Sequence, residues 1–167
     1  MTARVVAVIS NRGEAYGLER ARRANVPAVF LPKQREMERR TYDAVLAEQV
    51  HFFRPDWILL AGWMRLLSSV FLDQFPNRVI NLHPALPGAF PGTNAIERAY
   101  QAYRQGSIRS TGVMVHLVPD EGVDSGPVLR QECVEILRGE TLKELEQRIH
   151  DVEHRLLVDA LKQLTQL

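Results

Sequence analysis

Short apolar runs alternate along the chain with longer stretches whose apolar residues recur at helical spacing. The short runs are rich in Val, Ile and Leu and are bounded by Pro, Gly or Asn, which is typical of β-strands. These runs predict strands at residues 5–9, 28–31, 57–61, 79–82, 111–118 and 128–136. Two of them, residues 57–61 and 79–82, are almost continuously apolar, as expected for strands buried on both faces of a parallel sheet.

The stretches between the runs have the spacing of amphipathic helices. We expect helices at residues 18–24, 42–53, 66–75, 94–105 and 141–164. Pro55 interrupts the second helix, and Thr141 with Glu144 has the spacing of a capping box that begins the last one.

This alternation of strands and helices predicts an α/β fold with a mostly parallel sheet. In such folds ligands bind beyond the carboxyl ends of the strands, so the loops that follow the strands are the place to search for chemistry. Because no repeat, low-complexity tract or linker interrupts the pattern, we expect a single domain over residues 1–167.

Composition and charge narrow the classes of partner. The 167 residues include 21 basic and 20 acidic side chains, for a net charge of +1, so the concentrated basic surface that nucleic acid or an anionic membrane requires is not expected. No apolar run reaches the length of a membrane span, and the N-terminus does not have the pattern of a secretory signal. Cys133 is the single cysteine, which excludes an internal disulfide, and its place in an alternating run predicts a small buried strand residue. We therefore expect a cytoplasmic protein that acts on small molecules.

The segment VINLHPALPGAFPG contains the first group of candidate catalytic residues. Asn81 and His83 are two positions apart at the end of a predicted strand, so their side chains share one face of the sheet. An amide N–H and an imidazole aimed at one atom suit the negative oxygen of a tetrahedral intermediate. The alternative is that Asn81 caps a turn and His83 is a hydrogen-bonded core residue.

Acidic residues follow the next predicted strand in the segment HLVPDEGVDSGPVL. A carboxylate of Asp120, Glu121 or Asp124 near His83 would raise the imidazole pKa and prepare it to donate a proton. Three carboxylates could also bind a divalent cation, but no further ligand has suitable spacing. His150 and His154 do not have the metalloprotease arrangement with Glu153, so no metal is expected.

Four segments together resemble the glycinamide ribonucleotide (phosphoribosylglycinamide) formyltransferase family of the folate-dependent formyltransferase superfamily. They are SNRGEAYGLERAR, LAGWMRLLS, NLHPALPGAFPG and STGVMVHLVPDEGVDSGPVL, and they extend over nearly the whole chain. The resemblance implies a Rossmann-like formyltransferase fold with helices on both faces of the sheet. It also implies transfer of a formyl group from the co-substrate 10-formyltetrahydrofolate to the amine of glycinamide ribonucleotide, in purine biosynthesis, without a covalent enzyme intermediate.

The resemblance further assigns roles residue by residue. Asn81 would bind the formyl oxygen, His83 would be the proton donor, and Asp124 would raise the pKa of His83 and order water. The folate would contact Asn81, Asp124 and the residues Arg39, Met64, Arg65, Leu66, Leu67, Val118, Pro119 and Asp120. Glu153, on the last helix, would contact the glycinamide substrate.

The chain departs from the family pattern at its N-terminus. The family begins with a further strand and helix joined by a phosphate-binding loop, and this βα unit has no counterpart here. Three interpretations are open. The chain is shortened, or the formyl acceptor is smaller, or strand 5–9 takes the vacant place in the sheet and Arg12 attracts the substrate phosphate. A new sheet edge would favour homodimerisation. The alternative functions are those of a formyltetrahydrofolate hydrolase, a formyltransferase for another amine, or an inactive folate-binding paralogue.

Overall fold

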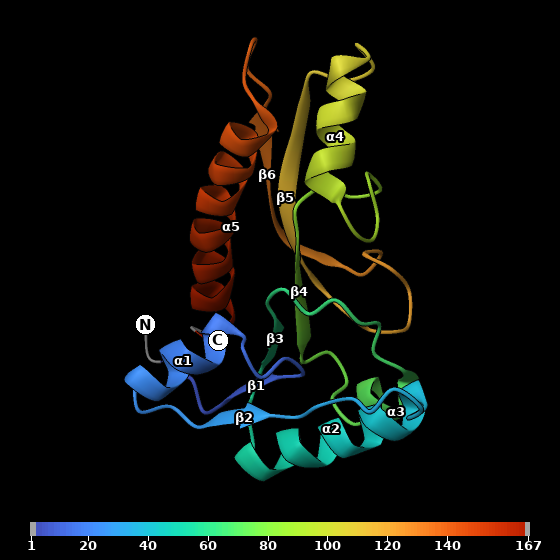
Figure 1. Cartoon of the computed structure of the whole chain (residues 1–167), viewed down its shortest axis with the longest axis vertical. Helices are drawn as coiled ribbons and strands as arrows, with labels where there is room; N and C mark the ends of the chain where they lie inside the picture. Colours follow the sequence, from blue (N-terminus) through green and yellow to red (C-terminus); the bar gives the residue numbers. More distant parts are fainter. Residues whose placement is uncertain (1–2, 166–167) are drawn as a thin grey trace. The chain divides into compact units, whose positions relative to one another are not determined.

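The computed structural model describes residues 3–165, as strands and helices that alternate through most of the chain (Figure 1). The strands are β1 (Val8–Ser10), β2 (Ala28–Phe30), β3 (Ile58–Leu60), β4 (Val79–His83), β5 (Ser110–Leu117) and β6 (Val128–Glu135). The helices are α1 (Tyr16–Arg23), α2 (Arg39–Phe53), α3 (Ser69–Leu72), α4 (Ala95–Arg104) and α5 (Leu142–Leu164). Each predicted element has a counterpart, although β1 shares only residues 8 and 9 with the predicted strand 5–9, and the predicted α/β fold is confirmed.

Contacts between residues group the chain into two compact units. Among the described residues, one unit contains Trp57–Leu66 and residues 76–165, and the other contains residues 3–56 together with Leu67–Phe75. The expectation of a single domain remains a prediction.

The unit that includes the N-terminal half is built on two parallel strands, β1 and β2, with α1 packed against both. Within it α2 packs against α3, and the buried Asp43 accepts a 2.7 Å hydrogen bond from the backbone N–H of Ser68 at the start of α3. Helix α3 is shorter than the predicted helix 66–75: residues 66–68 have no regular secondary structure, and residues 73–75 form a turn and a bend.

The other unit is a four-stranded sheet in the order β3-β4-β5-β6. Strands β3 and β4 are parallel, whereas β5 is antiparallel to both β4 and β6. Only ten residues, 118–127, join β5 to β6, and a parallel pair needs a longer crossover connection. The sheet is therefore parallel at the β3 end and antiparallel beyond β4.

One face of this sheet carries the apolar core. Helix α5 lies along β5 and β6, and α4 packs against β5 and α5 (Figure 1). Ile80, Val113 and Val115 from the strands meet Leu145 and Ile149 from α5, and all five are fully buried. The predicted capping box begins α5: Glu144 N–H donates to the Thr141 hydroxyl, and the Glu144 carboxylate accepts from Thr141 N–H.

Cys133 lies in β6, as predicted, but the prediction that it is buried was wrong. Its neighbour Val134 points into the core, and the period of a strand turns Cys133 to the opposite, exposed face. Among residues 3–165, no helix has the length and apolar character required to cross a membrane.

Candidate active site

The second face of β4 holds the first two predicted catalytic residues. Ile80 and Leu82 pack in the core, so the alternation of the strand turns Asn81 and His83 away from it together. His83 is nevertheless 4% exposed, because the loops that follow β4 and β5 cover it. The shared face predicted from the sequence is therefore present.

Asp124 reaches both residues from the loop between β5 and β6. Its Oδ1 accepts a 3.0 Å hydrogen bond from the Asn81 amide nitrogen, and its Oδ2 lies 3.2 Å from Nδ1 of His83. The loop closes tightly, because Leu117 N–H donates to Pro127 O and a Cβ at Gly126 would stand 1.9 Å from Leu117 O. Asp124 itself has a φ of 50°, a left-handed conformation that is strained for a side chain other than glycine. Such strain at an inward-facing carboxylate fits a residue placed for function.

The pKa of His83 differs in direction from the sequence-based prediction. Burial, the largest influence, lowers it below the ordinary value of 6.5, and the neighbouring carboxylate of Asp124 raises it but does not compensate. The predicted influence of Asp124 is correct in sign, but the predicted net increase was wrong, because the loss of solvent around the imidazolium is the larger effect.

At Asp124 the polar neighbours outweigh the effect of burial on the pKa. Burial alone would raise its pKa, but the His116 ring, the Gly92 N–H and, at acid pH, the protonated His83 favour the carboxylate and bring the pKa below its ordinary value. The pair therefore rests as an ionised Asp124 beside a neutral His83.

This charge state fixes the tautomer of His83. Its Nδ1 faces a carboxylate that can only accept, so Nδ1 carries the proton and Nε2 presents a lone pair. The Nε2 atom is buried and makes no hydrogen bond of good geometry within residues 3–165, although the backbone groups of Ala89 and Phe90 lie near enough to the ring to raise its pKa. A buried nitrogen left without a partner is costly in a purely structural histidine, so this atom is the natural place for a reacting proton.

His116 is a member of the site that the sequence analysis missed. It is the cross-strand partner of Asn81 in the β4–β5 pairing and is 2% exposed. Its Nδ1 donates to Leu117 O at 2.8 Å, and its Nε2 lies 3.2 Å from the Asn81 amide nitrogen and 3.5 Å from Asp124 Oδ1. A histidine inside an apolar strand was a visible signal, but its position opposite Asn81 depends on strand register, which the sequence does not show.

Several residues of the predicted folate pocket belong to the same unit as this cluster. Met64 and Leu66 are 70% and 47% exposed, an unusual amount of free apolar surface on neighbouring positions, and Arg65 between them is half-buried. Val118 is half-buried, and its backbone N–H donates a 2.9 Å hydrogen bond to Val79 O. Pro119 and Asp120 are exposed, and the Asp120 carboxylate accepts from Gly122 N–H.

The remaining predicted residues lie on other elements of the chain. Arg39, at the start of α2, and the buried Leu67 belong to the other compact unit. Glu153 lies on α5, where its carboxylate binds Nδ1 of His150 at 2.7 Å. Their assigned roles remain predictions.

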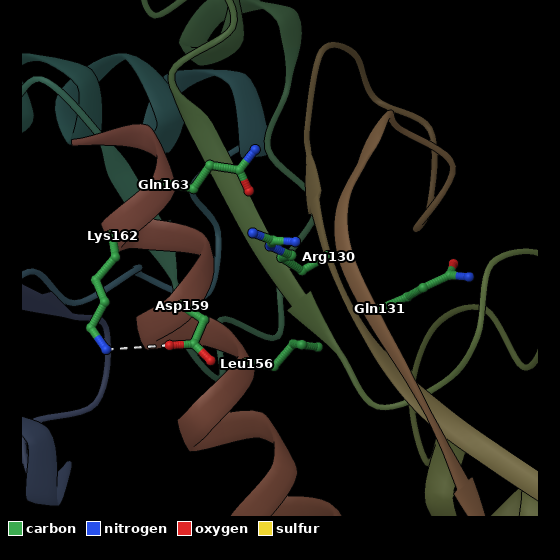
Figure 2. Close-up of a pocket in the computed structure, with 6 residues that line it drawn as sticks. All are labelled: Arg130, Gln131, Leu156, Asp159, Lys162 and Gln163. Carbon is green, nitrogen blue, oxygen red and sulfur yellow. Dashed lines mark hydrogen bonds and ion pairs between the residues drawn. The ribbon is translucent and has the colours of Figure 1, made fainter. Parts of the chain in front are cut away.

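A pocket lies elsewhere in this unit, between the C-terminal half of α5 and the edge strand β6. Figure 2 shows the ion pair between Lys162 and Asp159, 3.3 Å apart, on its helical side. The pocket is lined by Arg130, Gln131, Leu156, Asp159, Lys162 and Gln163. None of these is a predicted site residue. No group of three or more potential metal ligands occurs within residues 3–165.

Comparison with known proteins gives a consistent result. Residues 1–161 match the family model described as "Formyl transferase". The phosphoribosylglycinamide formyltransferase of Schizosaccharomyces pombe is 46% identical, over 97% of this chain and 83% of the relative. The enzyme of the same name from Dictyostelium discoideum is 40% identical, over 95% of this chain and 82% of the relative. The crystal structure of glycinamide ribonucleotide transformylase 1 from Geobacillus kaustophilus has a TM-score of 0.88 and 41% identity, and covers 97% of this chain and 84% of that one.

Proposed function

The chain belongs to the formyltransferase family, and from this premise we propose that it is a phosphoribosylglycinamide formyltransferase of purine biosynthesis. The reaction moves the formyl group of 10-formyltetrahydrofolate to the amine of glycinamide ribonucleotide. Relatives carrying that activity in their names match most of this chain at 35–46% identity.

The observation that carries the proposal is the assembly of Asn81, His83 and Asp124. Each comes from the position that the family motifs give it, and the three are joined by contacts of 3.0 and 3.2 Å. A proton acceptor, an amide donor and a fixed carboxylate are the groups that transfer of an acyl group between two nitrogens requires.

The catalytic cycle moves one proton from the amine to the folate nitrogen. His83 takes up at Nε2 the proton that the amine nitrogen loses as it attacks the formyl carbon. Asn81 donates an N–H to the formyl oxygen, which receives the carbonyl electron pair; this is the N–H that otherwise faces His116. His83 then returns the proton to the folate nitrogen as its bond to the formyl carbon breaks, and the carbonyl forms again.

The buried setting of His83 makes its basicity depend on the progress of the reaction. Before attack, burial keeps the pKa low and the ring neutral. When negative charge develops on the formyl oxygen, that charge favours the imidazolium and the pKa rises. Asp124 stays ionised and stabilises the imidazolium through Nδ1. His83 is therefore a good proton acceptor only while the intermediate exists.

The substrate-binding residues follow from the family resemblance. The exposed side chains of Met64 and Leu66 offer an apolar surface to the folate ring, and the loop from Val118 to Asp120 offers backbone groups. Arg39, Arg65 and Leu67 complete the proposed folate contacts, and Glu153 would meet the glycinamide substrate. A cytoplasmic location and a homodimer are further parts of the proposal, on the grounds of the single cysteine and a sheet with an open edge at β6.

Product analysis tests the proposal. The protein is incubated with 10-formyltetrahydrofolate labelled in the formyl group, with and without glycinamide ribonucleotide. We expect the label on the amine only when the acceptor is present. Label released as formate would identify a hydrolase, labelling of a different amine would identify another acceptor, and the absence of turnover by folded protein would contradict an enzymatic function.

A further inference from the structure

The loop between β4 and α4 has a regular and strained backbone. Residues at every second position have positive φ: Gly88 at 75°, Phe90 at 47°, Gly92 at 82° and Asn94 at 55°. Phe90 and Asn94 are not glycine, so surrounding contacts must hold them in this conformation.

Arg98, on the first turns of α4, supplies those contacts. Its Nη1 donates to Pro91 O at 2.7 Å and to Thr93 O at 3.2 Å, and its guanidinium carbon lies 5.7 Å from the centre of the Phe90 ring. One cation thus holds carbonyl groups on both sides of Gly92 and the aromatic ring before it.

The loop contacts the carboxylate of Asp124. Gly92 N–H donates to Asp124 Oδ2 at 2.8 Å, the same oxygen that lies 3.2 Å from Nδ1 of His83. Pro91 O and Gly92 N–H belong to a single peptide group, which therefore accepts from Arg98 at one end and donates to Asp124 at the other. Hydrogen bonds in series across one peptide polarise and strengthen each other.

We propose that Arg98 is a positioning residue for the proposed formyl transfer, because it orients the Pro91–Gly92 peptide that holds Asp124 against His83. The inference rests on the proposed function and adds a residue outside the catalytic trio. Arg98 touches neither the trio nor the reacting atoms; it acts through the loop.

The test compares Arg98→Met with Arg104→Met on the same helix. Arg104 is the exposed last residue of α4, so its replacement removes the same charge without disturbing the loop. For Arg98→Met we expect kcat to fall about 10- to 100-fold, the loss typical of a small misplacement of catalytic groups, with both KM values nearly unchanged. The kcat of Arg98→Lys should fall between this variant and wild type, because an ammonium group retains the charge but not the planar guanidinium whose Nη1 reaches both carbonyls.

A second readout separates positioning from a general loss of structure. The charged or titratable groups facing Asp124 are His83 from β4 and His116 from β5, and the loop adds the Gly92 N–H. Because His83 must be neutral to accept the proton, the acid limb of the kcat profile reports its protonation. Without the Gly92 N–H, Asp124 is no longer held against Nδ1 and raises the His83 pKa less, so the acid limb of Arg98→Met should move to lower pH while that of Arg104→Met does not.

Each outcome decides the matter. The inference is overturned if Arg98→Met has the same kcat and the same pH profile as Arg104→Met. If Arg98→Met does not fold, Arg98→Lys is compared with Arg104→Met in the same way. A fall in kcat without a pH shift also overturns it, because Asp124 would then be held without the loop. Wild-type protein in the same assay distinguishes this failure from failure of the proposed function, which would show as no transfer by wild type.

Discussion

Strands β4 and β5 present two faces of very different character. On one face Ile80, Val113 and Val115 meet α4 and α5 in an apolar core. On the other face His83 and His116 are almost as well buried and Asn81 is half-buried, yet the three form a chain of polar contacts that ends at Asp124. The same strands thus support a core and a reaction site on opposite faces.

The difference lies in what each face requires of a side chain. The core needs apolar side chains of suitable volume and tolerates exchange among them at modest cost. The polar face depends on individual atoms: the Asn81 nitrogen, the two nitrogens of His83 and the two oxygens of Asp124 each have a separate partner or task. Substitutions should therefore affect stability on the first face and turnover on the second.

The largest effect is expected from Asp124→Asn on the polar face. The amide keeps the shape of the side chain but removes the charge that stabilises the imidazolium of His83. We expect kcat to fall about 10²- to 10⁴-fold, as for loss of assisted proton transfer, with a cooperative thermal transition retained. Steady-state kinetics and a circular-dichroism melt measure the two quantities, and a variant with wild-type kcat would remove Asp124 from the mechanism.

The next largest effect is expected from Ile149→Ala on the apolar face. Ile149 is fully buried in the core, so its truncation should cost about 2–5 kcal/mol of unfolding free energy. The kcat of the folded protein should remain that of wild type. Val158→Ala on the exposed side of α5 is the control and should change stability little. A large loss of kcat in folded Ile149→Ala would show that the two faces are not separate.

A smaller effect on stability is expected at the start of α5. Thr141→Ala removes the hydroxyl that accepts from Glu144 N–H and so leaves a helix N–H without its cap. The melting temperature should fall by about 2–4 °C, with kcat unchanged. Thr141→Ser keeps the hydroxyl, so its melting temperature should be close to that of wild type. If its melting temperature equals that of Thr141→Ala instead, loss of the cap is not the cause of the decrease.

The smallest effect is the contribution of His83 to the pH dependence of stability. Because folding lowers its pKa below 6.5, the unfolded chain binds more protons, and stability is lost as the pH falls below that value towards the folded pKa. Urea unfolding is measured at about pH 7.5 and about pH 5.5. The unfolding free energy should decrease less between these pH values for His83→Gln than for wild type. Equal losses would contradict a lowered pKa.

The apolar face was the part that the sequence predicted best. The apolar runs of the strands and the capping box at Thr141 depend on neighbouring residues only, so each predicted strand and helix has a counterpart in the structure. The pairing of Asn81 and His83 was predicted for the same reason.

The polar face required information from distant parts of the chain. The contact between Asn81 and His116 depends on the register of β4 against β5, and Asp124 reaches His83 only because a loop closes at Gly126. The direction of the His83 pKa was predicted wrongly because it depends on how completely the loops exclude water. Arg98 was not identified because its contacts are to backbone carbonyls, which leave no pattern in the sequence.

The most direct test of the central claim is the kcat of His83→Gln, measured together with its affinity for 10-formyltetrahydrofolate. Glutamine fills similar space but cannot accept and return a proton at neutral pH. The account predicts a kcat reduced by about 10²- to 10⁴-fold and a folate affinity close to wild type. A near-normal kcat, or a loss of activity explained entirely by lost folate binding, would contradict the assignment of proton transfer to His83.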